Sequence, residues 1–238
     1  MNTEKIKISV VIPVFNEENT IISILKKINE QNIPNIDIEI IIINDGSTDN
    51  SLKIIEQNSN LYSKLINLKI NKGKGAAVRE GLKSANGEFI LFQDADLEYD
   101  PSEYPILFRP ILELDADIVM GSRLMSPPLT RVYYFWNKVG NRCITLLFDI
   151  LHNTTLTDIY SGYIVFRKEL LNPNNLRTDG WEQQAEILSK IVKDSRKIYE
   201  VPITYYGRTY QEGKKIKPKD VIKIIGTIIR EKIYPTKN

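Results

Sequence analysis

The segment EFILFQDADLEYDP, residues 88–101, joins an apolar run to carboxylates at every second position. Side chains of an extended segment alternate between its two sides, so Asp94, Asp96 and Glu98 are predicted to share one face. Like charges at this spacing repel one another and call for a positive partner. A divalent cation with oxygen ligands, Mg2+ or Mn2+, meets that need, because such ions combine carboxylates with substrate phosphates. A solvated acidic turn is the alternative.

Apolar runs on both sides of this segment predict strands that alternate with helices. The strands are expected at residues 6–13, 36–44, 64–70, 88–93 and 116–123. Nearly continuous apolar runs are typical of parallel strands that are covered on both faces. The alternation therefore predicts an α/β fold with right-handed crossovers and a mostly parallel sheet.

Capping residues predict where two of the helices begin. Asn16 is the expected cap of the first helix, with Glu17 and Glu18 in its first turn. Before the fourth helix, Asp100, Pro101 and Glu103 are expected as cap, first-turn proline and capping-box partner.

The regular alternation ends after Arg123. The remaining chain predicts helices over 141–153, 180–194 and 219–233, with strands that begin near residues 161 and 196. Because no segment resembles an interdomain linker, one domain over residues 1–238 is expected.

Composition excludes several classes of protein. The 32 Lys and Arg nearly balance the 30 Asp and Glu, which argues against nucleic acid as a partner. A single Cys143 excludes an internal disulfide and fits a reducing compartment, and a single His152 argues against a histidine-rich metal site. Neither a signal peptide nor an apolar run near the ~20 residues of a membrane span is evident, so a cytoplasmic location is expected.

Polar groups follow four of the predicted strands. They are Asn16–Glu17, Asp45–Ser47, Lys72–Lys74 and Asp94–Glu98. The carboxyl ends of parallel strands meet at one edge of an open sheet, where ligands bind. Each group alone has an ordinary explanation, such as capping by DGSTD or two exposed lysines in a turn. Their convergence on one edge predicts a ligand site.

These motifs, taken in order, resemble a known family. They are PVFNEE (13–18), NDGSTDNS (44–51), NKGKGAAVREGL (71–82), FQDADLEYDP (92–101), GSR (121–123) and VPITYYGRTYQEGKKI (201–216). They are similar to family 2 glycosyltransferases, and more narrowly to the dolichyl- or polyprenyl-phosphate mannose and glucose synthases. The resemblance implies a GT-A fold, with a Rossmann-like sheet flanked by helices. It also implies a nucleotide-sugar-binding half (1–122), an acceptor-binding half (123–238) and a divalent metal.

The resemblance also implies roles for residues of the first half. It places Pro13, Phe15 and Glu17 in the first nucleotide-contacting loop, Asp45 at the base, Asp94 near the ribose, and Asp96 and Glu98 at the metal. Lys72 and Lys74 lie on a glycine loop from which they could reach the diphosphate through charge-assisted hydrogen bonds.

Two classes of acceptor make opposite demands on the second half. A polyprenyl phosphate is already an oxyanion, since its second pKa is near ~6, and it needs cations rather than a base. Arg123 and Arg131 resemble the phosphate clamp of that branch, and Arg208 is a further candidate. A sugar hydroxyl needs a carboxylate base, for which Asp158 and Glu186 are the candidates.

Two positions depart from the family pattern and bear on the choice of sugar and acceptor. Gln184 stands where relatives carry an acid, and Ile164 stands at a position that is commonly basic.

We therefore predict a metal-dependent, inverting glycosyltransferase that moves glucose or mannose from a UDP- or GDP-sugar to a polyprenyl phosphate. The aromatic cluster Tyr133–Trp136 predicts peripheral contact with the inner face of the membrane; a dimer contact or a core is the alternative. The rival functions are a glycan-elongating transferase, a nucleotidyltransferase and an inactive nucleotide-sugar sensor. A GxGxRxxP-type loop, expected of a nucleotidyltransferase, does not follow the first strand.

Overall fold

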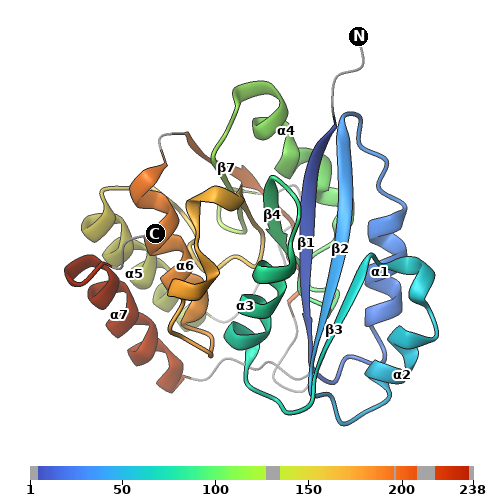
Figure 1. The fold of residues 1–238 in the computed structure, drawn as a ribbon. Helices are drawn as coiled ribbons and strands as arrows, with labels where there is room; N and C mark the ends of the chain where they lie inside the picture. Colours follow the sequence, from blue (N-terminus) through green and yellow to red (C-terminus); the bar gives the residue numbers. More distant parts are fainter. Residues whose placement is uncertain (1–4, 127–134, 196, 208–217, 236–238) are drawn as a thin grey trace.

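The computed structural model describes residues 5–126, 135–195, 197–207 and 218–235. One seven-stranded sheet runs through both halves of the chain in the order β3-β2-β1-β4-β6-β5-β7 (Figure 1). Its strands are β1 (Ile6–Val14), β2 (Ile36–Asp45), β3 (Lys64–Leu68), β4 (Phe89–Phe92), β5 (Ile118–Ser122), β6 (Ile164–Arg167) and β7 (Ile198–Pro202).

Parallel pairing dominates the sheet, as the sequence predicts. β1 pairs in parallel with β2 along its whole length, from Ile6 opposite Ile36 to Val14 opposite Asn44. Its other neighbour, β4, extends only to the level of Val11. Pro13, predicted to end this strand, therefore lies inside it at a level where β4 no longer needs a backbone donor.

β6 is the exception, because it runs antiparallel to both of its neighbours, β4 and β5. An antiparallel strand begins at the edge where its parallel neighbours end. The residues just before β6, around Gly162 and Tyr163, therefore lie beside the carboxyl end of β4. This reversal brings a loop of the second half to the edge that carries the acidic motif.

Helices cover both faces of the sheet, as Figure 1 shows. The core on one face includes residues of α1 (Ile21–Asn29), α2 (Ser51–Glu56) and α4 (Tyr104–Leu114). The core on the other face includes residues of α3 (Lys74–Ser84), α5 (Phe135–His152), α6 (Gln183–Asp194) and α7 (Pro218–Ile233). Four single-turn 3-10 helices lie at Ser59–Leu61, Pro101–Glu103, Lys168–Leu170 and Pro173–Asn175.

The first helix does not begin at its predicted cap. α1 begins at Ile21, so Glu17 and Glu18 precede it, and Asn16 instead accepts a hydrogen bond from the Thr48 amide at 2.8 Å. Asp100 does cap the 3-10 turn before α4.

Glu103, the expected capping-box partner of Asp100, instead accepts a hydrogen bond from the Thr204 amide at 2.7 Å. α5 also begins earlier than predicted, at Phe135, because the end of the aromatic cluster continues into the helix.

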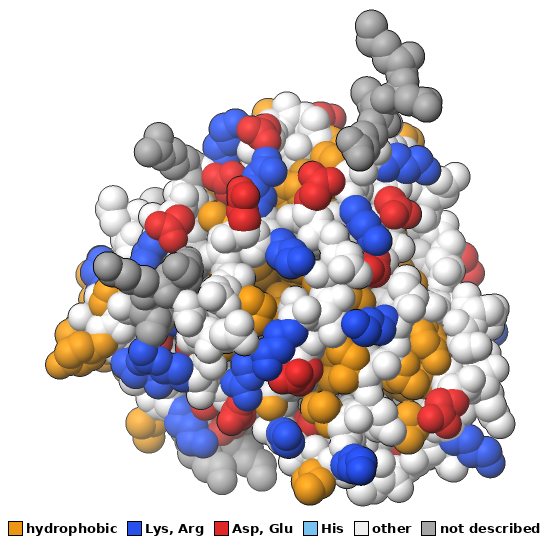
Figure 2. Space-filling model, viewed as in Figure 1, with side chains coloured by type: hydrophobic (Ala, Val, Ile, Leu, Met, Phe, Trp, Pro, Cys, Tyr) orange, Lys and Arg blue, Asp and Glu red, His pale blue; other side chains and the backbone are white. Residues whose placement is uncertain are grey.

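No helix in the described ranges combines the length and apolar character that a membrane crossing requires. The face drawn in Figure 2 mixes positive and negative side chains, in keeping with the nearly balanced charge of the chain.

Candidate functional site

The segments beyond the carboxyl ends of β1 and β2 are joined by hydrogen bonds from amides of the first to hydroxyls of the second. The amide of Asn16 donates to Ser47 Oγ at 3.1 Å, and the amide of Glu17 donates to Ser51 Oγ at 2.9 Å. The Glu17 side chain is buried, and its Oε2 accepts from Thr20 at 3.0 Å. The predicted nucleotide-contacting loop, with Pro13 and Phe15 half-buried at its start, is thereby held in one conformation.

Asp45, the predicted base reader, is a buried anchor for the glycine loop. Its two carboxylate oxygens accept hydrogen bonds from the amides of Lys72 and Gly73, at 2.8 and 2.9 Å. Gly46, at φ 65°, lies so close to this loop that a Cβ would stand 2.5 Å from the Asn71 nitrogen. The loop after β2 and the glycine loop therefore form one unit, from which the exposed Lys72 projects.

Lys74 connects the glycine loop to the acidic motif. Its ammonium forms an ion pair with Asp94 Oδ1 and lies 5.2 Å from the centre of the Trp181 ring. The Gly75 amide donates to the Asp179 carbonyl at 2.8 Å, which fixes the start of α3 against the segment before α6. Both partners of the ion pair retain about a quarter of their side-chain exposure, 26% for Lys74 and 22% for Asp94.

The acidic trio does not form one cluster. Asp94 pairs with Lys74, Asp96 Oδ1 accepts from the Glu98 amide at 3.2 Å, and Glu98 Oε2 accepts from the Tyr205 hydroxyl at 2.8 Å. Among the described residues, no three His, Cys, Asp or Glu side chains are grouped as a metal site. That Asp94, Asp96 and Glu98 jointly hold a cation stays a prediction.

Arg123 and Asp158 form a buried, two-pronged ion pair. Arg123 Nε and Nη2 donate to the two Asp158 oxygens at 2.7 and 2.8 Å, and Asn141 adds a third side-chain donor at 2.8 Å. Burial alone would raise the pKa of Asp158, but Arg123 and these hydrogen bonds hold it below its usual value. Asp158 orients Arg123 in this structure, and its role as a base stays a prediction.

Glu186, the other predicted base, is fully buried and saturated with donors. It accepts hydrogen bonds from the amides of Arg177 and Thr178 at 2.9 Å each and from the Thr178 hydroxyl at 2.6 Å. The Lys190 ammonium lies 3.7 Å from its Oε1. The carboxylate does not face solvent, and its role as a base stays a prediction. It secures the segment before α6.

Several predicted residues lie outside the described ranges. They are Arg131 and Arg208 of the acceptor clamp, and Tyr133 and Tyr134 of the aromatic cluster. Of that cluster, Phe135 and Trp136 are described, and both are largely exposed.

Three residues of the site are absent from the sequence-based prediction. Trp181 faces Lys74, Asn141 donates to Asp158, and Tyr205 contacts both Glu98 and Arg123. For Tyr205 the sequence offered a signal, because VPITYYG leads a predicted strand into the family motif. Asn141 and Trp181 carry no such signal.

Comparison with known proteins identifies the family. A model of glycosyl transferase family 2 matches residues 9–173, more than half of the chain. The chain belongs to this family. It is therefore a glycosyltransferase, and it has the GT-A fold that its structural neighbours share.

Three curated relatives illustrate its place in family 2. The chain is 27% identical over 97% of its length to an uncharacterized protein of Methanocaldococcus jannaschii, covering 94% of that protein. It is 29% identical over 84% of its length to the glycosyltransferase AglJ of Haloferax volcanii. It is 29% identical over 94% of its length to a dolichol-phosphate mannosyltransferase of Pyrococcus furiosus. It spans 63% of the length of each of the last two.

Solved structures share the fold at lower identity. Glucosyl-3-phosphoglycerate synthase from Mycobacterium tuberculosis, in complex with Mn2+, UDP-glucose and phosphoglyceric acid, superposes with a TM-score of 0.71 at 21% identity. The match covers 97% of this chain and 81% of that one. S. aureus TarS in complex with UDP-GlcNAc gives a TM-score of 0.61 at 21% identity, over 94% of this chain and 67% of that one.

Proposed function

We propose that this family 2 glycosyltransferase moves a hexose, glucose or mannose, from a UDP- or GDP-sugar to a polyprenyl phosphate with inversion at the anomeric carbon. The relative in Pyrococcus supports a lipid-phosphate acceptor through its name as a dolichol-phosphate mannosyltransferase. The two halves of the chain act as one catalytic domain, since one sheet runs through both.

The donor binds at the edge formed by the first half. Pro13, Phe15 and Glu17 flank the nucleoside, together with the loop that Asp45 anchors. Lys72 and Lys74 face the diphosphate, and Asp94 lies beside them at the end of β4. A basic loop above a carboxylate-bearing strand end suits a ligand that carries both phosphates and ribose hydroxyls.

The donor set at Asp96 fits Mg2+ or Mn2+. It consists of carboxylate oxygens without imidazole or thiolate, and such ions keep one or two protein carboxylates and take phosphate oxygens for the rest. Asp96 supplies the protein ligand, and the orientation of its carboxylate is set by the Glu98 amide. A bound cation would stabilise the charge that grows on the leaving diphosphate.

The hydrogen bonding of the two predicted bases, Asp158 and Glu186, supports a phosphate acceptor over a hydroxyl acceptor. Asp158 and Glu186 are both saturated by donors, so neither accepts a proton from an attacking hydroxyl. A phosphate monoester needs no base, because it is already an oxyanion at neutral pH. Arg123 uses Nε and one terminal nitrogen on Asp158, and a guanidinium has five N–H donors, so others are left to hold a phosphate.

The reaction then balances without a proton transfer. An oxygen of the acceptor phosphate attacks the anomeric carbon as the bond to the diphosphate breaks, and the electron pair leaves on the β-phosphate oxygen. Arg123 holds the acceptor phosphate, and Lys74 contacts the departing diphosphate. Arg131 and Arg208, predicted as further clamp residues, lie outside the described ranges.

The outer edge of the second half suits contact with a bilayer surface. The exposed side of α5 carries Trp136, Leu146 and Ile150 beside the exposed Lys138 and Arg142. The exposed side of the neighbouring α7 carries Ile222, Ile229 and Ile233. Apolar and aromatic side chains next to cations bind the interface of an anionic membrane. We propose this edge as the peripheral membrane contact through which the lipid acceptor is reached.

A transfer assay tests the proposed function. Purified protein is incubated with Mn2+ or Mg2+, one of UDP-glucose, GDP-mannose or GDP-glucose, and either a polyprenyl phosphate in anionic vesicles or a set of soluble glycans. We expect chloroform-soluble sugar only with the lipid phosphate, and its loss on adding chelator. Sugar transfer to a glycan hydroxyl would identify the elongating alternative. Donor binding without transfer to either acceptor class would point to a nucleotide-sugar sensor.

A further inference from the structure

Tyr205 lies between the acidic motif and the acceptor arginine. Its hydroxyl donates a 2.8 Å hydrogen bond to Glu98 Oε2, and the Arg123 guanidinium lies 4.9 Å from the centre of its ring. Tyr205 is the residue through which the carboxylate motif of the first half touches the ion pair of the second half. Neither contact follows from adjacency in sequence, since all three residues come from different segments.

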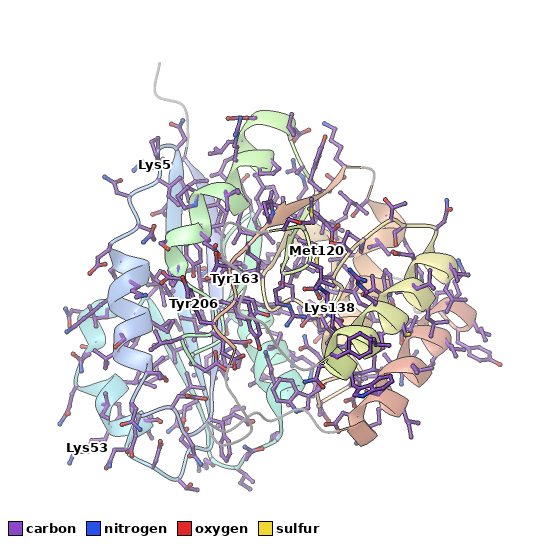
Figure 3. All side chains as sticks on the ribbon, turned by 180° about the vertical axis from the view of Figure 1, so that it is seen from behind. Lys5, Lys53, Met120, Lys138, Tyr163 and Tyr206 are labelled. Atoms are coloured by element: carbon purple, nitrogen blue, oxygen red, sulfur yellow. The ribbon has the colours of Figure 1, made fainter. Side chains whose placement is uncertain are left out.

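The backbone holds Tyr205 at this position through bonds to both neighbours. The Ile203 amide donates to the Ser122 carbonyl at 3.0 Å, next to Arg123, and the Tyr206 amide donates to the Glu98 carbonyl at 2.9 Å. The segment after β7 is therefore fastened to the two loops that its side chain joins. Figure 3 shows Tyr206 in the central part of the molecule, in the same region as Tyr163.

Ring packing and charge fix the orientation of the Tyr205 side chain. Its ring packs against Tyr99, with centroids 5.1 Å apart, and the Tyr99 hydroxyl accepts from the Gly162 amide at 2.8 Å. Its hydroxyl is held toward the acidic motif by the hydrogen bond that it donates to Glu98. The negative Glu98 therefore lies at the hydroxyl of Tyr205, and the positive Arg123 lies over its ring.

We propose that Tyr205 is a positioning residue that sets the Glu98 carboxylate beside the cation–diphosphate site and the Arg123 guanidinium beside the acceptor phosphate. The inference rests on the proposed function, because it assigns Glu98 to the donor site and Arg123 to the acceptor site. One tyrosine thereby fixes the spacing between the two substrates, a spacing that an in-line displacement requires to be short and constant. Its hydroxyl orients Glu98 at the donor site, and its ring orients Arg123 at the acceptor site.

Two substitutions separate these contributions. Tyr205→Phe removes the hydroxyl and keeps the ring under Arg123, whereas Tyr205→Leu removes both. Tyr206→Phe is the matched control, since Tyr206 is exposed and its amide bond to Glu98 does not depend on its side chain. Circular dichroism and thermal melting verify that each variant is folded.

The first measurement is calorimetric binding of Mn2+ with UDP or GDP, which needs no acceptor and no turnover. Loss of a hydrogen bond to a charged group should weaken binding about tenfold in Tyr205→Phe. Tyr206→Phe should bind like the wild type. Unchanged or tighter binding in Tyr205→Phe would overturn the assignment of the hydroxyl. Combining Tyr205→Phe with Glu98→Gln should add little to either single change, because both remove one contact.

The second measurement is the acceptor KM at saturating donor. Tyr205→Phe should leave this KM unchanged, whereas Tyr205→Leu should raise it about fivefold, as expected on losing a cation–π contact of ~1 kcal/mol. An equal rise of the acceptor KM in both variants, or no rise in either, would refute the separate roles proposed for the hydroxyl and the ring. A wild-type enzyme that binds nucleotide and transfers no sugar would refute the proposed function instead, while the calorimetric result would still decide the role of the hydroxyl.

Discussion

Asp94 at the donor edge differs from Asp158 and Glu186 of the second half in burial and in the number of partners that its carboxylate has. At the donor edge, Asp94 meets one ammonium and remains partly exposed. In the second half, Asp158 and Glu186 are fully buried, and each accepts several hydrogen bonds. Among these three motif acids, Asp94 is the one whose carboxylate a ligand can approach.

This contrast has a physical basis. A buried charge is retained only when hydrogen bonds and an opposite charge compensate its desolvation, and such a carboxylate stabilises local structure. A partly exposed pair such as Lys74–Asp94 is weakly bound, so a ligand with several charges can displace it. Identical residue types therefore have opposite functions in the two regions, and partner number distinguishes them better than sequence position does.

The largest expected effect comes from Asp96→Ala. If Asp96 is the protein ligand of the catalytic cation, its loss should lower kcat about a thousandfold, on the order of 4 kcal/mol of transition-state stabilisation. The melting temperature should change little, because Asp96 is partly exposed. Asp37→Ala, at an exposed position near the opposite end of β2, is the control. A kcat within threefold of the wild type in Asp96→Ala would show that Asp96 is not the ligand of a catalytic cation, and the proposed difference between the two regions would fail.

The reverse pattern is expected for Glu186→Ala. Removing this carboxylate leaves the Arg177 and Thr178 amides without their acceptor and Lys190 with one fewer anion. Breaking a buried charged network costs about 3 kcal/mol, which lowers the melting temperature of a chain of this length by about 10 °C. Glu113→Ala, which removes an exposed i,i+4 pair with Arg109, should shift it by less than a degree or two.

Kinetics of the folded fraction test the same assignment. If Glu186→Ala melts like the wild type and loses kcat, then Glu186 is a base, and a hydroxyl acceptor becomes the better reading.

A smaller effect is expected from His152, which is half-buried at the end of α5 and stacks on Phe148 with ring centroids 4.3 Å apart. Burial, with Lys232 and Lys193 nearby, lowers the pKa of His152 from 6.5 to about 4. The folded imidazole stays neutral while the unfolded one binds a proton, so stability is lost as the pH falls from 6.5 toward 4. Because the ring is partly exposed, solvent screening reduces the loss to about 1 kcal/mol.

Urea unfolding at pH 7.5 and pH 5 measures this loss against His152→Gln, which cannot titrate. The wild type should lose about 1 kcal/mol more than the variant between the two pH values. Parallel pH curves for the two proteins would show that His152 takes up protons equally in both states.

The sequence predicted the parallel core of the sheet because strand pairing there follows apolar periodicity. β1, β2 and β4 are largely apolar runs, and each is found within a few residues of its predicted place. The reversed direction of β6 could not be predicted from periodicity, since an apolar run does not encode its direction. That direction follows from tertiary packing and decides which second-half loop reaches the donor edge.

The site was predicted in part for the same reason. Motif residues Asp45, Lys74 and Asp94 follow strands, and the structure brings them to one edge. The blocked state of Asp158 was not predictable, because its donors Arg123 and Asn141 are 35 and 17 residues away in sequence. Whether a carboxylate acts as a base or holds another side chain in place depends on such distant donors, and one sequence does not specify them.

The smallest effect is expected at the donor edge itself, from Lys74→Met. Asp94 and the diphosphate are alternative partners for the Lys74 ammonium, which is partly exposed between Asp94 and Trp181. An ion pair at such exposure contributes up to about 1 kcal/mol, so the Kd for UDP or GDP should rise about fivefold. Lys83→Met, farther along α3 and paired with Glu80, is the control and should leave the Kd unchanged.

The salt dependence of the same titration separates the two partners of Lys74. Contact with the diphosphate predicts that wild-type affinity falls as salt rises from about 50 to about 300 mM, and that Lys74→Met flattens this slope. If Lys74 serves only Asp94, the substitution leaves the slope unchanged, and the Lys74–Asp94 pair then belongs with the structural ion pairs of the second half. Because an exchangeable pair is what sets the donor edge apart, this modest titration is the most direct check of the contrast.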